Sequence, residues 1–204
     1  MITSSINKEK LVRIFINKIK VPKKNLEKQI IIAPVGVVAS GKTTAMKILK
    51  SMIPTVYINA DEVRVFLRNK KMWGPLEAYG IITPTIRHFL ESGESIIIDG
   101  DFVDKKTRRQ PLENLAKKFN ARVYYIHVIA PEKFILKKLK NKKWTKSGLF
   151  SSSTEGIREY LRRKPLHQKK LKIKFIGTVD TSKSVKSQLL KIVSKIRAMS
   201  RFLL

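Results

Sequence analysis

Cysteine is absent from the 204-residue sequence. Its absence excludes disulfide bridges, thiolate zinc sites and a cysteine nucleophile, and it is compatible with a reducing cytosol. Histidine is scarce, and the three that are present argue against a histidine-rich metal site. Long apolar runs are missing too, because the longest uncharged apolar stretch, residues 29–41, falls short of the roughly 18 to 20 residues that span a bilayer. We therefore expect no membrane segment.

The N-terminal residues 1–15 lack the continuous apolar core and the small-residue cleavage site of a secretory signal. Together with the missing cysteine, this predicts a cytoplasmic protein. Hydrophobic residues make up 43% of the chain, which is enough to build a sizeable core.

Acidic residues are few, since 15 Asp and Glu stand against 44 Lys and Arg, for a formal net charge of +29. Such an excess favours nucleic acid as a partner, because cations that neutralise phosphates release condensed counterions. Compositional drift is the alternative, since 32 of the basic residues are lysine. The distribution favours function: residues 133–174 hold 15 basic and two acidic residues, which is nearly half of the excess.

Five short apolar runs rich in isoleucine and valine alternate with helix-like segments. Runs that are apolar on both faces are typical of buried parallel strands. The alternation predicts a three-layer α/β fold with about five parallel strands. The expected strands are residues 29–35, 55–59, 95–99, 122–129 and 173–180, and the expected helices between them are 43–52, 62–69, 76–92 and 107–119.

The chain reads as one main domain with additions. An N-terminal helix within residues 1–28 has apolar side chains on one face, so we expect it to pack on a domain formed by residues 29–204. A C-terminal helix shows the same spacing. The basic segment at about residues 131–171 is the expected lid. No pattern indicates an oligomeric state.

The strongest motif follows the first expected strand. Residues 36–43 match G-x-x-x-x-G-K-S/T between a strand and a helix, which is the context of a phosphate-binding loop. Its backbone N–H groups would surround the phosphates, Lys42 would reach the β- and γ-phosphates, and Thr43 would bind Mg²⁺. The expected ATP-binding residues are Gly36, Ala39, Ser40, Gly41, Lys42, Thr43 and Thr44.

Carboxylates cluster at the ends of the second and third expected strands, where open α/β sheets bind ligands. Asp61 could accept the proton of an attacking hydroxyl while Arg64, one helical turn on, holds an acceptor phosphate. Asp61 is also a suitable helix N-cap, and the sequence leaves this alternative open. Because acidic residues are rare in this lysine-rich chain, the clustering of these carboxylates favours a site that binds Mg²⁺ and transfers protons. The clustered acids are Asp61, Glu62, Asp99, Asp101 and Asp104.

These motifs resemble those of the P-loop kinases that include phage polynucleotide 5′-kinase, the zeta-type toxins and similar small-molecule kinases, with an AAA-type ATP-binding domain. The resemblance covers residues 29–161 and rests on GVVASGKTT, INADEVR, SIIIDGDFVDKKTRRQ and VYYIHVIAPEKFILKK. It implies an ATP-dependent kinase with Asp61 as general base and Arg64 as an acceptor-binding residue. With Lys42, these are the expected catalytic residues. Thr43 and Asp99 are the expected Mg²⁺ ligands.

The lid departs from the pattern of this group. Where the group has arginines four residues apart, this chain has Lys138 and Lys142, which supply charge without the planar fork of arginine. We expect these lysines, together with Asp101, Arg108 and Arg109, as acceptor or lid contacts. The alternative for the lysines is a solvated helix face.

The acceptor stays open at this point. A 5′-hydroxyl of RNA or DNA fits the net charge and the INADEVR motif, whereas a nucleotide sugar or another small metabolite fits the rest of the group. A nucleotide-gated ATPase that binds nucleic acid is a second functional class. Asp61 counts against it, because a switch needs no base on the acceptor side.

Overall fold

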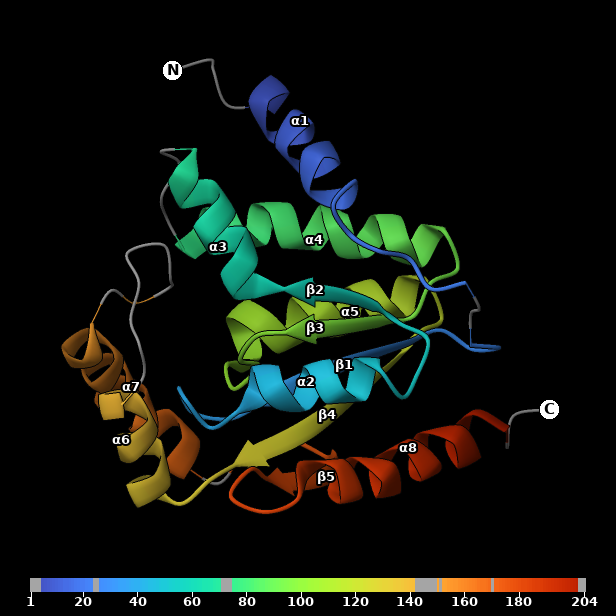
Figure 1. Cartoon of the computed structure of the whole chain (residues 1–204). Coiled ribbons are helices and arrows are strands. Elements are labelled where there is room, and N and C mark those ends of the chain that lie inside the picture. The colour runs from blue at the N-terminus through green and yellow to red at the C-terminus, as the bar shows by residue number, and fades with distance from the viewer. Residues whose placement is uncertain are drawn as a thin grey trace.

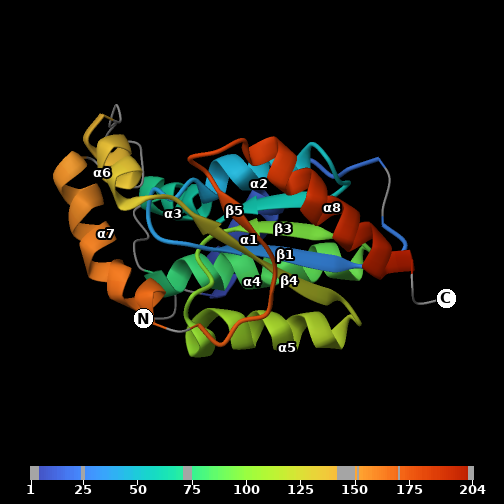
Figure 2. The same ribbon diagram turned by 90° about the horizontal axis from the view of Figure 1, so that it is seen from below.

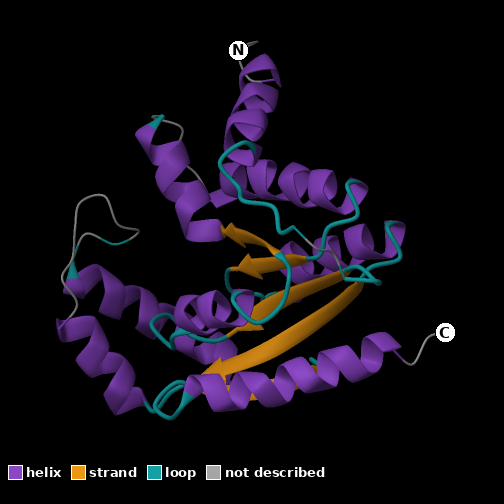
Figure 3. Cartoon of the chain, turned by 45° about the vertical axis from the view of Figure 1, so that its right-hand side comes forward, coloured by secondary structure: helices purple, strands orange, loops and turns teal. Residues whose placement is uncertain are grey.

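A parallel β-sheet forms the centre of the fold. The computed structural model describes residues 5–23, 26–70, 75–141, 150, 152–169 and 171–201. Five strands pair in the order β2-β3-β1-β4-β5, all parallel, and helices cover both faces of the sheet (Figures 1 and 3). The predicted three-layer α/β fold is thereby confirmed.

The elements follow each other in the expected alternation. The strands are β1 Ile30–Val35, β2 Val56–Asn59, β3 Ile96–Asp99, β4 Arg122–Ile129 and β5 Phe175–Asp180. The helices are α1 Ser5–Ile16, α2 Lys42–Lys50, α3 Ala60–Asn69, α4 Pro75–Glu91, the π-helix η1 Lys105–Arg109, α5 Gln110–Lys118, α6 Glu132–Asn141, α7 Ser153–Gln168 and α8 Val185–Arg201.

Two apolar cores lie on the two faces of the sheet, because successive side chains of a strand point to opposite faces. In β1, Ile31 and Ala33 join the core with α3, α4 and α5, while Ile30 and Ile32 join the core with α2 and α8. Figure 2 shows α2 and α8 on one side of the sheet and α5 on the other. All residues of β1 are buried, as a strand between two helical layers requires.

The terminal helices pack on this frame. The buried side chains of Leu11 and Phe15 place α1 against α4 (Figure 1). At the other end, α8 packs on β5 and α2 through Leu189 and Ile192. Gly177 of β5 allows this approach, because a Cβ there would lie 2.7 Å from Cγ1 of Ile192.

The carboxyl ends of the strands point toward α6 and α7 (Figure 1). β1 is the switch point of the sheet, with β3 and β2 on one side and β4 and β5 on the other. Open α/β sheets bind ligands at such a point, so the loop after β1 is the expected centre of the site. Within the described ranges, no helix combines the length and the apolar character needed to cross a membrane.

Candidate active site

The loop after β1 turns directly into α2. Gly36 has no room for a side chain, because a Cβ there would lie 2.2 Å from the carbonyl oxygen of Val128. Ala39 and Gly41 have positive φ angles of 61° and 94°, a region that favours glycine. The chain thereby makes a tight turn that ends at the N-terminus of α2, where backbone N–H groups suit a phosphate.

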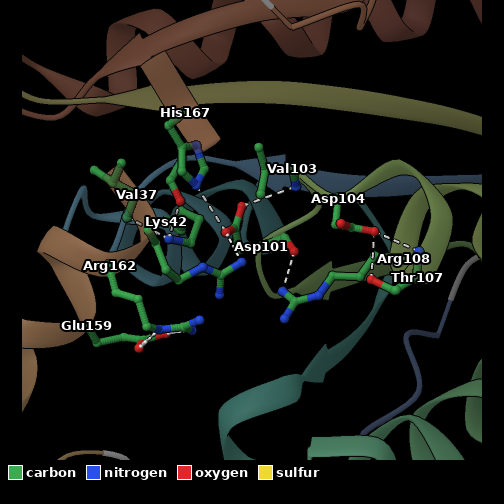
Figure 4. A network of polar contacts seen from close by, with 12 residues as sticks. Val37, Lys42, Asp101, Val103, Asp104, Thr107, Arg108, Glu159, Arg162 and His167 are labelled. Atoms are coloured by element: carbon green, nitrogen blue, oxygen red, sulfur yellow. Dashed lines mark hydrogen bonds and ion pairs between the residues drawn. The ribbon is translucent and has the colours of Figure 1, made fainter. Parts of the chain in front are cut away.

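Lys42, the first residue of α2, folds back over this loop. Its Nζ donates hydrogen bonds to the carbonyl oxygens of Gly36 and Val37, both at 2.7 Å (Figure 4). Burial lowers the pKa of Lys42, and nearby carboxylates, foremost Asp101, oppose this change. The ammonium group therefore lies at the mouth of the loop, where it can exchange carbonyl oxygens for phosphate oxygens.

The expected ATP-binding residues divide into two groups. Those that line the cleft are Ala39, Gly41, Lys42, Thr43 and Thr44. Gly36 and Ser40 are not among its lining residues. Ser40 is fully buried, and its backbone oxygen accepts a 2.6 Å hydrogen bond from the hydroxyl of Thr181. The turn between β5 and α8 thus supports the loop, a contact that the sequence did not predict.

Two side chains with oxygen atoms that could bind a metal ion, Asp99 and Thr43, lie together at the end of β3. Asp99 is buried, and its carboxylate accepts hydrogen bonds from Thr43 and from the hydroxyl of Tyr57, the latter at 2.7 Å. Burial raises the pKa of Asp99, and both hydrogen bonds lower it. Mg²⁺ prefers oxygen ligands, and P-loop enzymes hold it with a loop Ser or Thr and a strand-end Asp. The predicted ligands Thr43 and Asp99 are therefore adjacent and chemically suited to Mg²⁺. Tyr57 was not predicted.

Asp61 and Arg64 lie on one face of α3, as their spacing predicts. Nη1 of Arg64 is 2.5 Å from Oδ1 of Asp61, and both residues line the cleft. The N-cap of α3 is Asn59, whose side chain accepts hydrogen bonds from the backbone N–H groups of Asp61 and Glu62. The interpretation of Asp61 as the N-cap is therefore wrong. Its side chain is 47% exposed and open to a ligand.

Asp101 connects the sheet edge to the lid. Its buried carboxylate lies 2.7 Å from Arg163 and 3.1 Å from His167, both on α7, and Figure 4 shows His167 pointing toward it. Its backbone oxygen accepts a hydrogen bond from Arg108. Burial would raise the pKa of Asp101, but the hydrogen bond from His167 and the charges of Lys42 and Arg163 bring it down to about 2. Asp101 is therefore ionised at neutral pH and holds α7 at the cleft.

The lid supplies arginines as well as lysine. Arg158, Arg162 and Arg163 of α7 line the cleft together with Lys138 of α6. Residues 142–149 lie outside the described ranges, and the expected contact Lys142 is among them. The prediction placed the four-residue spacing on α6, but arginines with this spacing stand on α7, in the run REYLRR at residues 158–163. Their planar forks suit phosphate oxygens better than lysine does.

These groups surround one cleft of about 880 Å³, a volume within the roughly 300 to 1,000 Å³ of known ligand sites. Arg108 lines it, as expected. Arg109 does not, and its expected place at the acceptor needs correction, because it is buried and lines a different cavity. Both residues belong to η1, and neighbouring side chains of a helical turn point in different directions.

Comparisons with known proteins agree with this architecture. A family model described as an AAA domain matches residues 31–164, more than half of the chain. A search of the curated proteins finds no match. Among solved structures, a protein of Chloroflexus aurantiacus j-10-fl whose name proposes a kinase is similar, with 17% identity, a TM-score of 0.62, and coverage of 84% of this chain and 98% of that one.

Two further similar structures are small-molecule kinases by name. A gluconokinase from Sinorhizobium meliloti 1021 has 11% identity and a TM-score of 0.55, with coverage of 88% of this chain and 97% of that one. The Mycobacterium tuberculosis APS kinase, solved with AMPPNP and APS, has 9% identity and a TM-score of 0.53, with coverage of 83% and 98%. At such identities the likeness shows a shared fold. The chain belongs to the AAA-domain family and has the fold of the P-loop kinases.

Proposed function

We propose that this protein is an ATP-dependent kinase that transfers the γ-phosphoryl group of ATP to a hydroxyl acceptor. The observation that carries the proposal is the convergence of three groups on one cleft: Lys42 of the phosphate-binding loop, Asp61 of α3, and the arginines of α7. A nucleotide switch needs the loop and Mg²⁺ ligands, but it has no use for a carboxylate and a guanidinium on the acceptor side.

Each residue has a task in this reaction. The loop and Lys42 bind the β- and γ-phosphates, while Thr43 and Asp99 would hold Mg²⁺, which supplies charge neutralisation at the phosphate oxygens. Asp61 accepts the proton of the acceptor hydroxyl. The hydroxyl oxygen forms a bond to the γ-phosphorus of ATP while the bond between this phosphorus and the β-phosphate oxygen of the leaving ADP breaks. Arg64 exchanges its contact with Asp61 for an anionic group of the acceptor.

The arginines of α7 act on the other side of the transferring group. Arg162 is 68% exposed and pairs with Glu159, so its guanidinium can exchange that surface carboxylate for a phosphate, whereas Arg163 is largely buried in its pair with Asp101. Planar guanidinium groups at the developing negative charge lower the barrier to phosphoryl transfer. α7 lines the cleft, so in this proposal it covers the reacting groups and limits the access of water.

A small anionic hydroxyl compound is the acceptor that the surroundings favour. Arg64 pairs with Asp61, and Arg108 lines the same cleft; both guanidinium groups suit a carboxylate or phosphate. Similar structures include a gluconokinase, an APS kinase and a shikimate kinase, each named for a small acceptor. A polynucleotide 5′-hydroxyl, as in phage polynucleotide kinase, is the second candidate. The exposed lysines of α6 favour it, and Lys138 among them lines the cleft.

Incubation with γ-labelled ATP and a panel of acceptors tests the proposal. The panel holds 5′-hydroxyl oligonucleotides, nucleotide sugars, nucleosides and small hydroxy acids, and the Lys42→Ala variant measures the background. Label in one acceptor class identifies the substrate class. Hydrolysis of ATP with no labelled acceptor in any class contradicts the kinase proposal and favours an ATPase.

A further inference from the structure

A second cavity, of about 600 Å³, lies between α5, the start of β5 and the end of α8. None of the described residues lines both this cavity and the catalytic cleft. Its volume is within the range of small-molecule sites, roughly 300 to 1,000 Å³. The sheet is irregular here, because the pairing of β4 and β5 shifts register between Tyr125 and Ile126. We call this space the β5 cavity.

The walls of the β5 cavity are mainly apolar and aromatic. The lining residues of this kind are Val123, Tyr124, Tyr125, Ile173, Phe175, Ile176, Ala198 and Met199. The first residues of β5, which is an edge strand of the sheet, are half-buried and so leave room beside β4. Aromatic rings and aliphatic side chains around an open space suit a ligand with an apolar body.

The charges around the β5 cavity are mostly positive. Glu113 is the carboxylate among the lining residues, and it accepts a 2.9 Å hydrogen bond from the hydroxyl of Tyr125. The cations that line the cavity are Arg109, Lys172, Lys174 and Lys195. Because a carboxylate already bound to a tyrosine does not balance four cations, the cavity attracts an anion.

Two buried polar groups of this cavity have unsatisfied atoms. Arg109 is 7% exposed and Tyr124 is 8% exposed. Nε of Arg109 and the hydroxyl of Tyr124 have no hydrogen-bond partner within the described part of the chain. Arg109 also forms no ion pair with any described residue. The charge of Arg109 acts on Asp104, but not through a direct ion pair. A buried guanidinium without a direct partner is costly, and a bound ion or ligand is one explanation for such a group.

We propose that the β5 cavity binds a small organic anion with an aromatic or apolar body, whose anionic group meets Arg109 and the lysines at the rim. The body of the ligand packs between the aromatic walls, and its acidic group supplies the direct ion pair that Arg109 lacks. The site is separate from the catalytic cleft and does not depend on the kinase reaction.

A matched pair of fluorescent probes tests this site. 8-Anilinonaphthalene-1-sulfonate carries a sulfonate, whereas N-phenyl-1-naphthylamine has the same ring system without it. We expect the sulfonate to bind at one site per chain and more tightly than the neutral probe. Titration of the wild-type protein with both probes, followed by fluorescence, measures the two dissociation constants.

Variants locate the binding to the β5 cavity. Lys174→Gln with Lys195→Gln removes two rim charges and should weaken the sulfonate about fivefold, with little effect on the neutral probe. Lys186→Gln with Lys191→Gln is the matched control, since these exposed lysines do not line the cavity. Ala198→Phe fills the space from an exposed position and should abolish binding of both probes.

The expected result is loss of binding of both probes in Ala198→Phe. In the rim variant, but not in its matched control, the sulfonate should bind about fivefold more weakly, with unchanged circular dichroism in all variants. Equal affinity for both probes in the wild-type protein overturns the proposal. So does sulfonate binding that Ala198→Phe leaves intact, or an equal loss in the rim variant and its matched control.

Discussion

Replacing Asp101 by asparagine should destabilise the whole fold, because its buried carboxylate pairs with the charge of Arg163 in the lid. The Asp101 side chain is 8% exposed, and Arg163, at 2.7 Å, is 14% exposed. Asparagine keeps the size of the side chain and removes its charge. The substitution therefore leaves the guanidinium of Arg163 in a buried position without a partner.

The structure sets the expected size of the effect. The pKa of Asp101 is about 2, compared with an ordinary 3.8. Since one pKa unit corresponds to about 1.4 kcal/mol, the charged form contributes about 2.5 kcal/mol to the free energy of unfolding. Loss of one partner of a buried pair costs about 3 to 5 kcal/mol in other proteins, so we expect a loss of at least about 2.5 kcal/mol at pH 7.

The effect should depend on pH in a defined direction. The pKa of Asp101 is lower in the folded protein, so its contribution is complete above the ordinary pKa and is lost as the pH falls toward about 2. The difference in free energy of unfolding between wild type and Asp101→Asn should therefore be constant from about pH 7 to 5. Below about pH 4 it should shrink.

Urea unfolding followed by circular dichroism measures this difference. Glu159→Gln is the control, because Glu159 also lies on α7 but pairs with Arg162, which is 68% exposed. Loss of such an exposed pair costs less than about 1 kcal/mol. Equal losses for Asp101→Asn and Glu159→Gln at pH 7 would refute the reasoning that Asp101 fastens the lid to the sheet.

Three further predictions concern the cleft. Lys42→Ala should abolish turnover with an unchanged circular dichroism spectrum, and full activity in the folded variant would contradict the phosphate-binding loop. Gly36→Ala should weaken ATP binding in calorimetry, because its Cβ would lie 2.2 Å from the Val128 oxygen; unchanged affinity would contradict this. If the acceptor is a polynucleotide, its KM should rise with salt with a log-log slope of about 0.7 per phosphate contacted, and a flat slope excludes it. Replacement of five lid lysines by glutamine should flatten this slope. The five lysines are Lys137, Lys138, Lys140, Lys142 and Lys143.

The strands were predictable because the sequence encodes them locally. Runs that are apolar on both faces mark buried parallel strands, and β4 has the predicted bounds Arg122–Ile129. β5 begins at Phe175 instead of residue 173, because its pairing with β4 begins at Tyr125 and Phe175. The strand order β2-β3-β1-β4-β5 was not predicted, since pairing between distant strands leaves no local pattern.

The site was predictable where one motif holds the contacting residues. Lys42 and Thr43 are adjacent in the loop, and Asp61 and Arg64 are one helical turn apart. Contacts between distant segments were missed. His167 reaches Asp101 across 66 positions, which no spacing rule covers.

Arg109 shows a different limit of the sequence. The pair of arginines in TRRQ predicts two contacts at the acceptor, but the π-helical turn η1 sends Arg108 to the cleft and Arg109 to the β5 cavity. A π-turn has no reliable signature in a single sequence, so the divergence is visible only in the structure. The cap of α3 is similar, because both Asn59 and Asp61 are good capping residues and only the strand end decides between them.

The measurement that tests the central claim most directly is the kinetics of Asp61→Asn with the acceptor that the labelling panel identifies. If Asp61 is the general base, the rate of transfer falls at least about a hundredfold, while the dissociation constant of ATP stays nearly unchanged. Asn59 already caps α3, so the thermal stability should also stay close to that of the wild type. A variant that transfers phosphate at the normal rate, or one that loses ATP binding instead, would contradict the account.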